Sequence, residues 1–195
     1  MKKSLLIAGF CLIAGTMFIA SSCSKKDDTT TTTTTPTVTL YTRVGGTTLV
    51  SDPAHAGQMI EQGRLTLRAV VDSSIYVIAA DTNLQKYFPV LFAELGANNT
   101  TGLVALSKNF TDFMCVATGS TNTSYSYTGK SMRDAHDPAT NSRMGLKVNA
   151  ADFDKFVGDI GVGLAQNGVN STNNKALVDD LVALLYTTKS AIVQR

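Results

Sequence analysis

The chain has 195 residues, of which 44% are hydrophobic and 16% are charged, which is enough for one ordinary core with tails. Its formal net charge of +2 falls near zero once a predicted signal segment carrying two lysines is removed. Because the sequence has no arginine-rich stripe and no aromatic ladder, the composition argues against nucleic-acid binding.

The first 22 residues are organised like a secretory signal. Two lysines precede an apolar run from Leu5 to Ala20, which is shorter than the roughly 20 residues that span a bilayer. The four residues that end at Cys23, Ala-Ser-Ser-Cys, resemble a bacterial lipoprotein box. We therefore expect residues 1–22 to be a cleaved lipoprotein signal peptide, with Cys23 acylated and the protein anchored to the outer membrane of the cell envelope. The alternative is a soluble secreted protein.

Residues 23–37 form the next segment, which contains a Lys-Asp-Asp cluster and a run of threonines but no aromatic or aliphatic side chain. Such a composition cannot bury a core, so we expect a disordered tether. The Lys-Asp-Asp cluster resembles export signals of surface lipoproteins. Both the cell surface and the periplasmic face of the membrane stay open as locations.

Cysteine usage excludes a disulfide framework within the mature chain. Cys11 leaves with the signal peptide and Cys23 is the expected acylation site, so Cys115 alone stays in the folded part. Because Cys115 lies among apolar residues of a helical segment, we expect a buried and unreactive thiol.

From residue 38 onward the hydrophobic periodicity is helical, and no convincing alternating strand is present. We expect one all-α domain over residues 38–195. Asp52 followed by Pro53 predicts a helix start, with the helix running to about Ala80 and divisible at Gly57 and Gly63.

Four more helical segments are predicted farther along the chain. A second long helix has its apolar face between Leu103 and Ala117 and ends at Gly119. A short helix covers Ser131 to His136, and the last two helices cover about 150–166 and 171–193. The last two have apolar stripes suited to an antiparallel pair.

Two motifs carry a resemblance to a known family. The segment 127–136, Tyr-Thr-Gly-Lys-Ser-Met-Arg-Asp-Ala-His, is followed at 151–154 by Ala-Asp-Phe-Asp. Together they resemble the proximal segment of group I truncated haemoglobins. Tyr-Thr-Arg-Val-Gly-Gly at 41–46 and the Tyr-Phe pair at 87–88 are similar to further family positions. The resemblance implies a two-over-two helical sandwich with an inserted helical segment near its N-terminus, haem b as cofactor, and His136 as the iron ligand.

A haem site of the globin type uses a neutral imidazole at the iron and an apolar slot around the macrocycle. The resemblance implies that Phe88 packs on the haem face and that Lys108 and Tyr127 reach the propionates. Lys108 has a plain alternative as a solvated helix residue, and Met132 has one as core filler. The full set of implied haem contacts is His136, Phe88, Lys108, Tyr127, Met132, Phe113, Phe153 and Val157.

The distal side of the implied pocket departs from the family pattern. Ile75 stands where the family usually has a ligand-binding tyrosine, and Tyr76 is one position away, about 100° around a helix. Asn109 replaces the usual glutamine, with Ala105 one turn before it. We therefore expect weak retention of oxygen. The other histidine, His55, is expected to be exposed, with a role as a sixth iron ligand as the alternative.

Two classes of function follow. The first is a haem protein that reversibly binds a diatomic gas, O2, NO or CO, with nitric-oxide-detoxifying activity as an extension. That activity would need a partner reductase, because the sequence has no flavin or nicotinamide fingerprint. The second is a tethered, non-enzymatic adhesion module on a degenerate globin scaffold, using the polar loops at 120–126 and 170–174.

Overall fold

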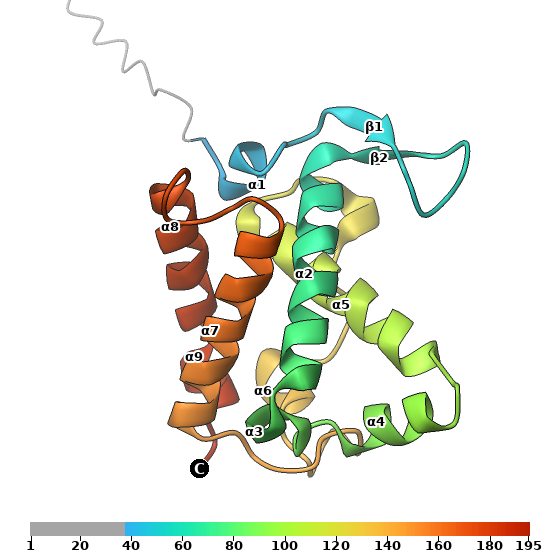
Figure 1. The fold of residues 1–195 in the computed structure, drawn as a ribbon, viewed down its shortest axis with the longest axis vertical. Coiled ribbons are helices and arrows are strands. Elements are labelled where there is room, and N and C mark those ends of the chain that lie inside the picture. The colour runs from blue at the N-terminus through green and yellow to red at the C-terminus, as the bar shows by residue number, and fades with distance from the viewer. Residues whose placement is uncertain (1–37) are drawn as a thin grey trace, which may run out of the picture. The chain divides into compact units, whose positions relative to one another are not determined.

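The computed structural model describes residues 38–195 (Figure 1). The predicted signal peptide, Cys23 and the threonine-rich tether lie outside the described residues. Within 38–195, no helix has both the length and the apolarity needed to cross a membrane. The elements are α1 (Leu40–Arg43), β1 (Leu49–Ser51), β2 (Met59–Glu61), α2 (Gln62–Ala80), α3 (Thr82–Gln85), α4 (Pro89–Gly96), α5 (Thr101–Thr118), the 3-10 turn η1 (Thr123–Tyr125), α6 (Met132–Ala135), α7 (Ala150–Gln166), α8 (Lys175–Tyr186) and α9 (Lys189–Ile192).

Helix α2 is the centre of the domain, and it packs mainly against α7 on one side and α5 on the other (Figure 1). Helices α7 and α8 lie side by side, as their apolar stripes predict. The core joins these helices through Leu67 and Val71 of α2, Phe153 of α7 and Leu181 of α8, all at most 2% exposed. The predicted all-α fold is confirmed.

The two central helices approach each other closely at a glycine. Gly163 of α7 faces Ser74 of α2, and a Cβ atom at Gly163 would collide with the Ser74 hydroxyl and crowd its backbone. The Ser74 hydroxyl donates to the Val70 carbonyl at 2.7 Å, so this buried group is satisfied within its own helix.

The prediction that a helix begins at Asp52 is wrong, because this segment is a β-hairpin in which β1 and β2 pair antiparallel. The Asp52 carboxylate accepts from the Ala54 amide at 2.9 Å and so caps a turn instead of a helix. The same carboxylate is bonded by Arg68 of α2 at 2.6 Å, which fastens the hairpin to the domain. The inserted segment near the N-terminus is therefore a hairpin, and α2 begins only at Gln62.

The structure confirms the helices predicted in the regions of α5, α6 and α7. Gly119 ends α5 in the left-handed conformation, with φ of 97°. The last predicted helix is shorter and interrupted between α8 and α9, where the hydroxyls of Thr187 and Thr188 donate to the carbonyls of Leu184 and Leu185. After α9, Val193 forms a parallel bridge with Val148. Helix α4 was not predicted.

Candidate functional site

His136 stands at the C-terminal end of α6, a helix that Ser131 caps by accepting from the Asp134 amide at 3.1 Å. The Nδ1 atom of His136 lies 2.8 Å from the Met132 carbonyl oxygen. A carbonyl can only accept, so Nδ1 carries a proton, and in the neutral ring Nε2 then keeps its lone pair. Burial lowers the pKa of His136, and the Met132 carbonyl opposes the shift only in part. The site therefore holds a neutral imidazole, the form that ligates metals.

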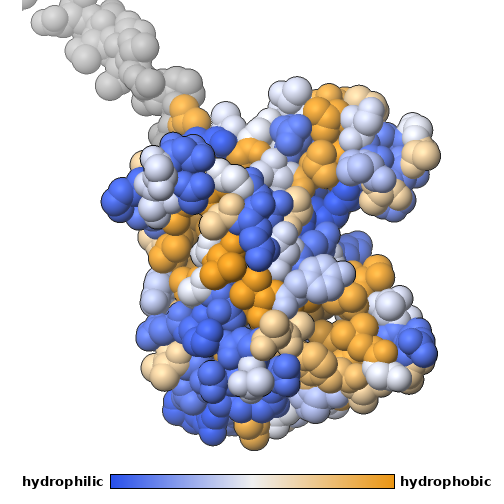
Figure 2. Space-filling view, viewed as in Figure 1, coloured by the Kyte–Doolittle hydropathy of each residue, from blue (hydrophilic) through white to orange (hydrophobic). Residues whose placement is uncertain are grey.

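A cavity of about 50 Å³ adjoins His136. Its walls are mostly aromatic and aliphatic and come from α3, the α3–α4 connection, the segment between α6 and α7, α7 and α9. Figure 2 shows further apolar surface over the neighbouring α4 and α5, below the hairpin. The other lining residues are Leu84, Tyr87, Phe88, Met144, Val148, Asp152, Phe153, Phe156 and Ile192.

One edge of this cavity is polar. The Tyr87 hydroxyl donates to Asp152 Oδ2 at 2.6 Å, and Lys86 pairs with the same oxygen at 2.8 Å. Arg195 donates to the Tyr87 hydroxyl at 3.2 Å. The bonds from Lys86 and Tyr87 hold the pKa of Asp152 below its usual range, so it is a paired carboxylate.

The structure brings together three of the predicted haem contacts, His136, Phe88 and Phe153, around one cavity. Val157 is 4% exposed and lies one turn after Phe153 on α7. Met132 is half-buried and supplies the carbonyl that orients His136.

Phe113 of α5 is half-buried and meets the ring of Tyr127 edge-on, with 6.2 Å between centroids. The Tyr127 hydroxyl donates to the Lys130 carbonyl at 2.7 Å. Lys108 is 64% exposed at its side chain and pairs with Asp112 at 2.6 Å. Neither Lys108 nor Tyr127 lines the cavity. Their propionate roles stay predictions.

The four predicted distal residues lie outside the cavity lining. Ile75 is 7% exposed in the core, whereas Tyr76, about 100° farther around an uninterrupted α2, is 70% exposed. The bulge that Tyr76 would need in order to turn inward is not present in this helix. Ala105 and Asn109 are exposed on α5.

The other histidine, His55, belongs to the hairpin, where its Nδ1 atom lies 2.8 Å from Asp52 Oδ2 and its side chain is 58% exposed. The structure therefore supports the exposed role and not the sixth-ligand role. Across residues 38–195, no cluster of three or more His, Cys, Asp or Glu could hold a metal ion. A haem iron needs only one axial protein ligand, and His136 can supply it.

Sequence reasoning missed several lining residues. Tyr87 and Asp152 lie inside the quoted motifs and Phe156 lies on the helix predicted over 150–166, but neither the motifs nor the periodicity assigns them a place at the haem. Met144 and Val148 come from the irregular segment after His136, where no periodicity marks an inward side chain. Only the structure shows that they reach the cavity.

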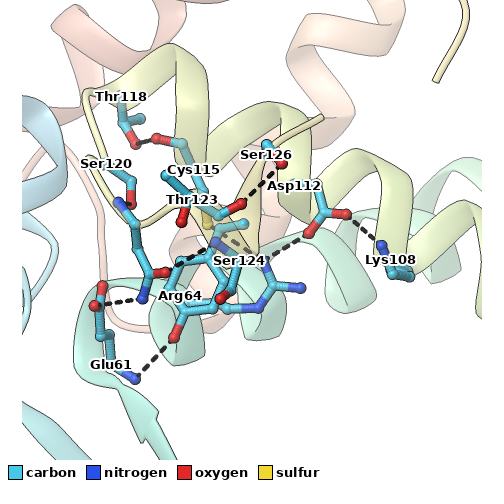
Figure 3. Close-up of polar contacts among 12 residues, drawn as sticks. Glu61, Arg64, Lys108, Asp112, Cys115, Thr118, Ser120, Thr123, Ser124 and Ser126 are labelled. Carbon is cyan, nitrogen blue, oxygen red and sulfur yellow. Dashed lines mark hydrogen bonds and ion pairs between the residues drawn. The ribbon is translucent and has the colours of Figure 1, made fainter. Parts of the chain in front are cut away.

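A second buried polar cluster lies between α2, α5 and η1 (Figure 3). Arg64 pairs with Asp112 at 2.7 Å, lies 3.7 Å from the Cys115 sulfur and stacks over Tyr125 at 4.4 Å. Cys115 is fully buried, and burial raises the pKa of its thiol to about 11 although Arg64 opposes the shift. The predicted buried thiol is confirmed.

No family model and no curated protein matches the chain. Two solved structures are similar to it, both Fe(III) forms of the truncated haemoglobin from Tetrahymena pyriformis. The variant with glutamine replaced by glutamate has a TM-score of 0.55 and 19% sequence identity to this chain. The variant with tyrosine replaced by phenylalanine has a TM-score of 0.53 and 18% sequence identity. Each comparison covers 80% of this chain and 99% of the other. The chain therefore has the fold of a truncated haemoglobin, as the resemblance of its motifs predicted.

Proposed function

We propose that residues 38–195 bind haem b with His136 as the axial ligand to iron. The observation that carries this proposal is a buried neutral imidazole whose Nδ1 is held by the Met132 carbonyl inside a truncated-haemoglobin fold. Metal-ligating histidines commonly donate their second ring nitrogen to a backbone carbonyl in this way. The motif around His136, which resembles group I of the family, adds an independent argument.

The chemistry of the lining fits a haem. Phe88, Phe153 and Phe156 offer flat apolar surfaces, and Val157 closes the core behind them. In this proposal these side chains exclude water, while Met132 fixes the plane of the imidazole ring. The cavity is well below the roughly 300 Å³ at which cofactor pockets begin, so lining residues must move on binding.

The propionates would lie where Lys108 and Tyr127 can reach them. Lys108 pairs with Asp112 at the surface and is free to exchange partners, and Tyr127 bonds only a local carbonyl. When bound, haem would supply an iron site for O2, NO or CO. Since Tyr76 faces solvent and Ile75 has no donor, the protein would give such a ligand few hydrogen bonds. We further propose that any oxidation of nitric oxide uses a separate reductase.

The decisive experiment is an absorption spectrum of the protein produced with haem supply, in ferric, ferrous and carbon monoxide forms. We expect a Soret band that shifts with carbon monoxide and that is lost or strongly altered in His136→Ala. His55→Ala is the matched control, because it removes the only other histidine from an exposed turn and should leave the spectrum unchanged. A folded, haem-supplied wild type without a Soret band would refute the proposal.

The adhesion alternative keeps one supporting observation, since residues 171–174 form an exposed loop of Ser, Thr and Asn. It predicts no Soret band and no effect of His136→Ala on haem content.

We also propose that Cys23 carries the lipid anchor and holds the protein at the outer membrane. Metabolic labelling with a fatty acid should mark the wild type and not Cys23→Ala. An unlabelled wild type would refute the anchor without bearing on the haem site.

A further inference from the structure

The segment 137–149, which joins α6 to α7, covers the His136 cavity. It begins directly after His136 and places two of its side chains, Met144 and Val148, in the cavity wall beside Phe88 and Phe153. Met144 is unbranched and flexible, so it fills space that another group can claim when the backbone beneath it moves. Any enlargement of the cavity on this side requires a shift of this segment.

Both ends of segment 137–149 are fixed. At the first end, the Asn141 side chain donates to the Ala135 carbonyl at 2.7 Å and the Thr140 hydroxyl donates to the Asp134 carbonyl at 2.8 Å. At the second end, the Val148 carbonyl accepts from the Gln194 amide at 2.9 Å. The part free to move is therefore the middle, residues 142–147.

Within segment 137–149, the Met144 amide donates to the Asn141 carbonyl at 3.0 Å and Lys147 pairs with Asp137 at 3.8 Å. One ion pair and one backbone bond join the middle to other parts of the domain. Arg143 makes two bonds to the Glu94 carboxylate of α4, at 2.8 and 2.6 Å. The Gly145 amide donates to the Tyr87 carbonyl at 3.1 Å. The ion pair packs directly against Gly102 of α5, where a Cβ atom would collide with both the Glu94 carboxylate and the Arg143 guanidinium.

This fastening is reversible. The side chains of Arg143 and Glu94 are 46% and 21% exposed, so water and salt compete for the pair. Segments held by few buried contacts and by solvent-exposed bonds open at lower free energy than the core.

We propose that segment 142–147 is a latch over the His136 cavity, closed by the Arg143–Glu94 pair on Gly102, and that it must open for haem to enter. This inference rests on the proposed haem function and adds the route by which the cofactor reaches His136. The latch governs the rate of entry, and its opening is salt-sensitive because a partly exposed ion pair closes it.

Stopped-flow mixing of haem-free protein with haem tests the latch, with the appearance of the Soret band as the signal. Glu94→Gln and Arg143→Gln should each speed association about two- to fivefold, the scale of one exposed pair. Gly102→Ala should do the same without removing a charge, because it displaces the pair sterically. Lys175→Gln is the matched control, since it breaks an exposed ion pair with Asp179 far from the latch.

Hydrogen exchange supplies a readout that needs no haem. The amides of 142–147 should exchange faster in Glu94→Gln and Arg143→Gln, and added salt should speed exchange and haem entry in the wild type but hardly in these variants. Wild-type rates and wild-type exchange in both variants would overturn the latch while leaving haem binding intact. A wild type that never binds haem would overturn the proposed function, and the latch with it.

Discussion

Removal of Asp112 should be among the most damaging single changes in the domain. Its side chain is 3% exposed and pairs with Arg64, whose side chain is 14% exposed. In Asp112→Ala the guanidinium would stay buried against the Cys115 sulfur and the Tyr125 ring, and neither can replace a carboxylate (Figure 3). Breaking a buried pair from one side costs about 3–5 kcal/mol. Domains of this kind have about 5–15 kcal/mol in total, so the loss is a large share.

Two further variants test whether the loss in free energy of unfolding comes from the unpaired buried charge. Lys108→Ala removes the other partner of Asp112, but that side chain is 64% exposed, so we expect a loss below about 1 kcal/mol. The double variant Arg64→Met with Asp112→Leu removes both buried charges at once and should recover to within about 1–2 kcal/mol of the wild type.

Urea unfolding followed by circular dichroism suits this comparison because the chain has no tryptophan. The midpoint should fall in Asp112→Ala with an unchanged slope. Equal losses in Asp112→Ala and Lys108→Ala, or a double variant as unstable as Asp112→Ala, would show that the buried charge is not what destabilises the protein.

Three further predictions follow. Burial lowers the pKa of His136 in the folded state, so the unfolded chain binds this proton first as the pH falls. The contribution of neutral His136 to the free energy of unfolding should be complete above the reference pKa of 6.5 and should be lost as the pH falls toward the lower pKa of the folded state. Urea titrations should show a shallower decline in His136→Gln than in the wild type, and an equal decline would contradict the assignment. Gly163→Ala should lower the free energy of unfolding by about 1–3 kcal/mol through its clash with Ser74. Gly158→Ala has open space at its Cβ and should raise the free energy of unfolding by up to about 1 kcal/mol. Similar changes in the free energy of unfolding for the two variants would argue against a tight α2–α7 contact. Ile75→Tyr should slow oxygen dissociation from the haem-loaded protein about ten- to hundredfold, measured by stopped flow, because it adds a distal donor worth about 1.5–3 kcal/mol; an unchanged rate would place residue 75 away from the ligand.

The sequence was sufficient for elements whose signals are local. Asn149 caps α7 by accepting from the Asp152 amide, and Gly119 ends α5, and both boundaries agree with the prediction. The motif around His136 likewise predicted an inward histidine, because one short helix fixes the relation of Met132 to His136. The resemblance named Phe88 and Phe153 as haem contacts, and the structure places both at the cavity beside His136, while their contact with haem stays a prediction.

Signals that depend on tertiary contacts were misread. Asp52 and Pro53 suit both a helix start and a turn, and the bond to Arg68, 16 residues later, belongs to the hairpin alternative. The cavity contributions of Met144 and Ile192 depend on where irregular segments return to the core. Lys108 pairs with Asp112, four residues later on the same helix, a local pairing that the spacing permits and that the propionate interpretation did not weigh.

Because Cys115 is buried, the reactivity of its thiol can report how often the folded domain opens. It is the one free thiol among the described residues and has no exposed surface, so a thiol reagent can reach it only when α2 and α5 separate. The labelling rate in native buffer would therefore follow the population of molecules that are open at this one site. In an oxidising compartment the same seal would keep this part of the chain out of mixed disulfides for as long as the fold persists.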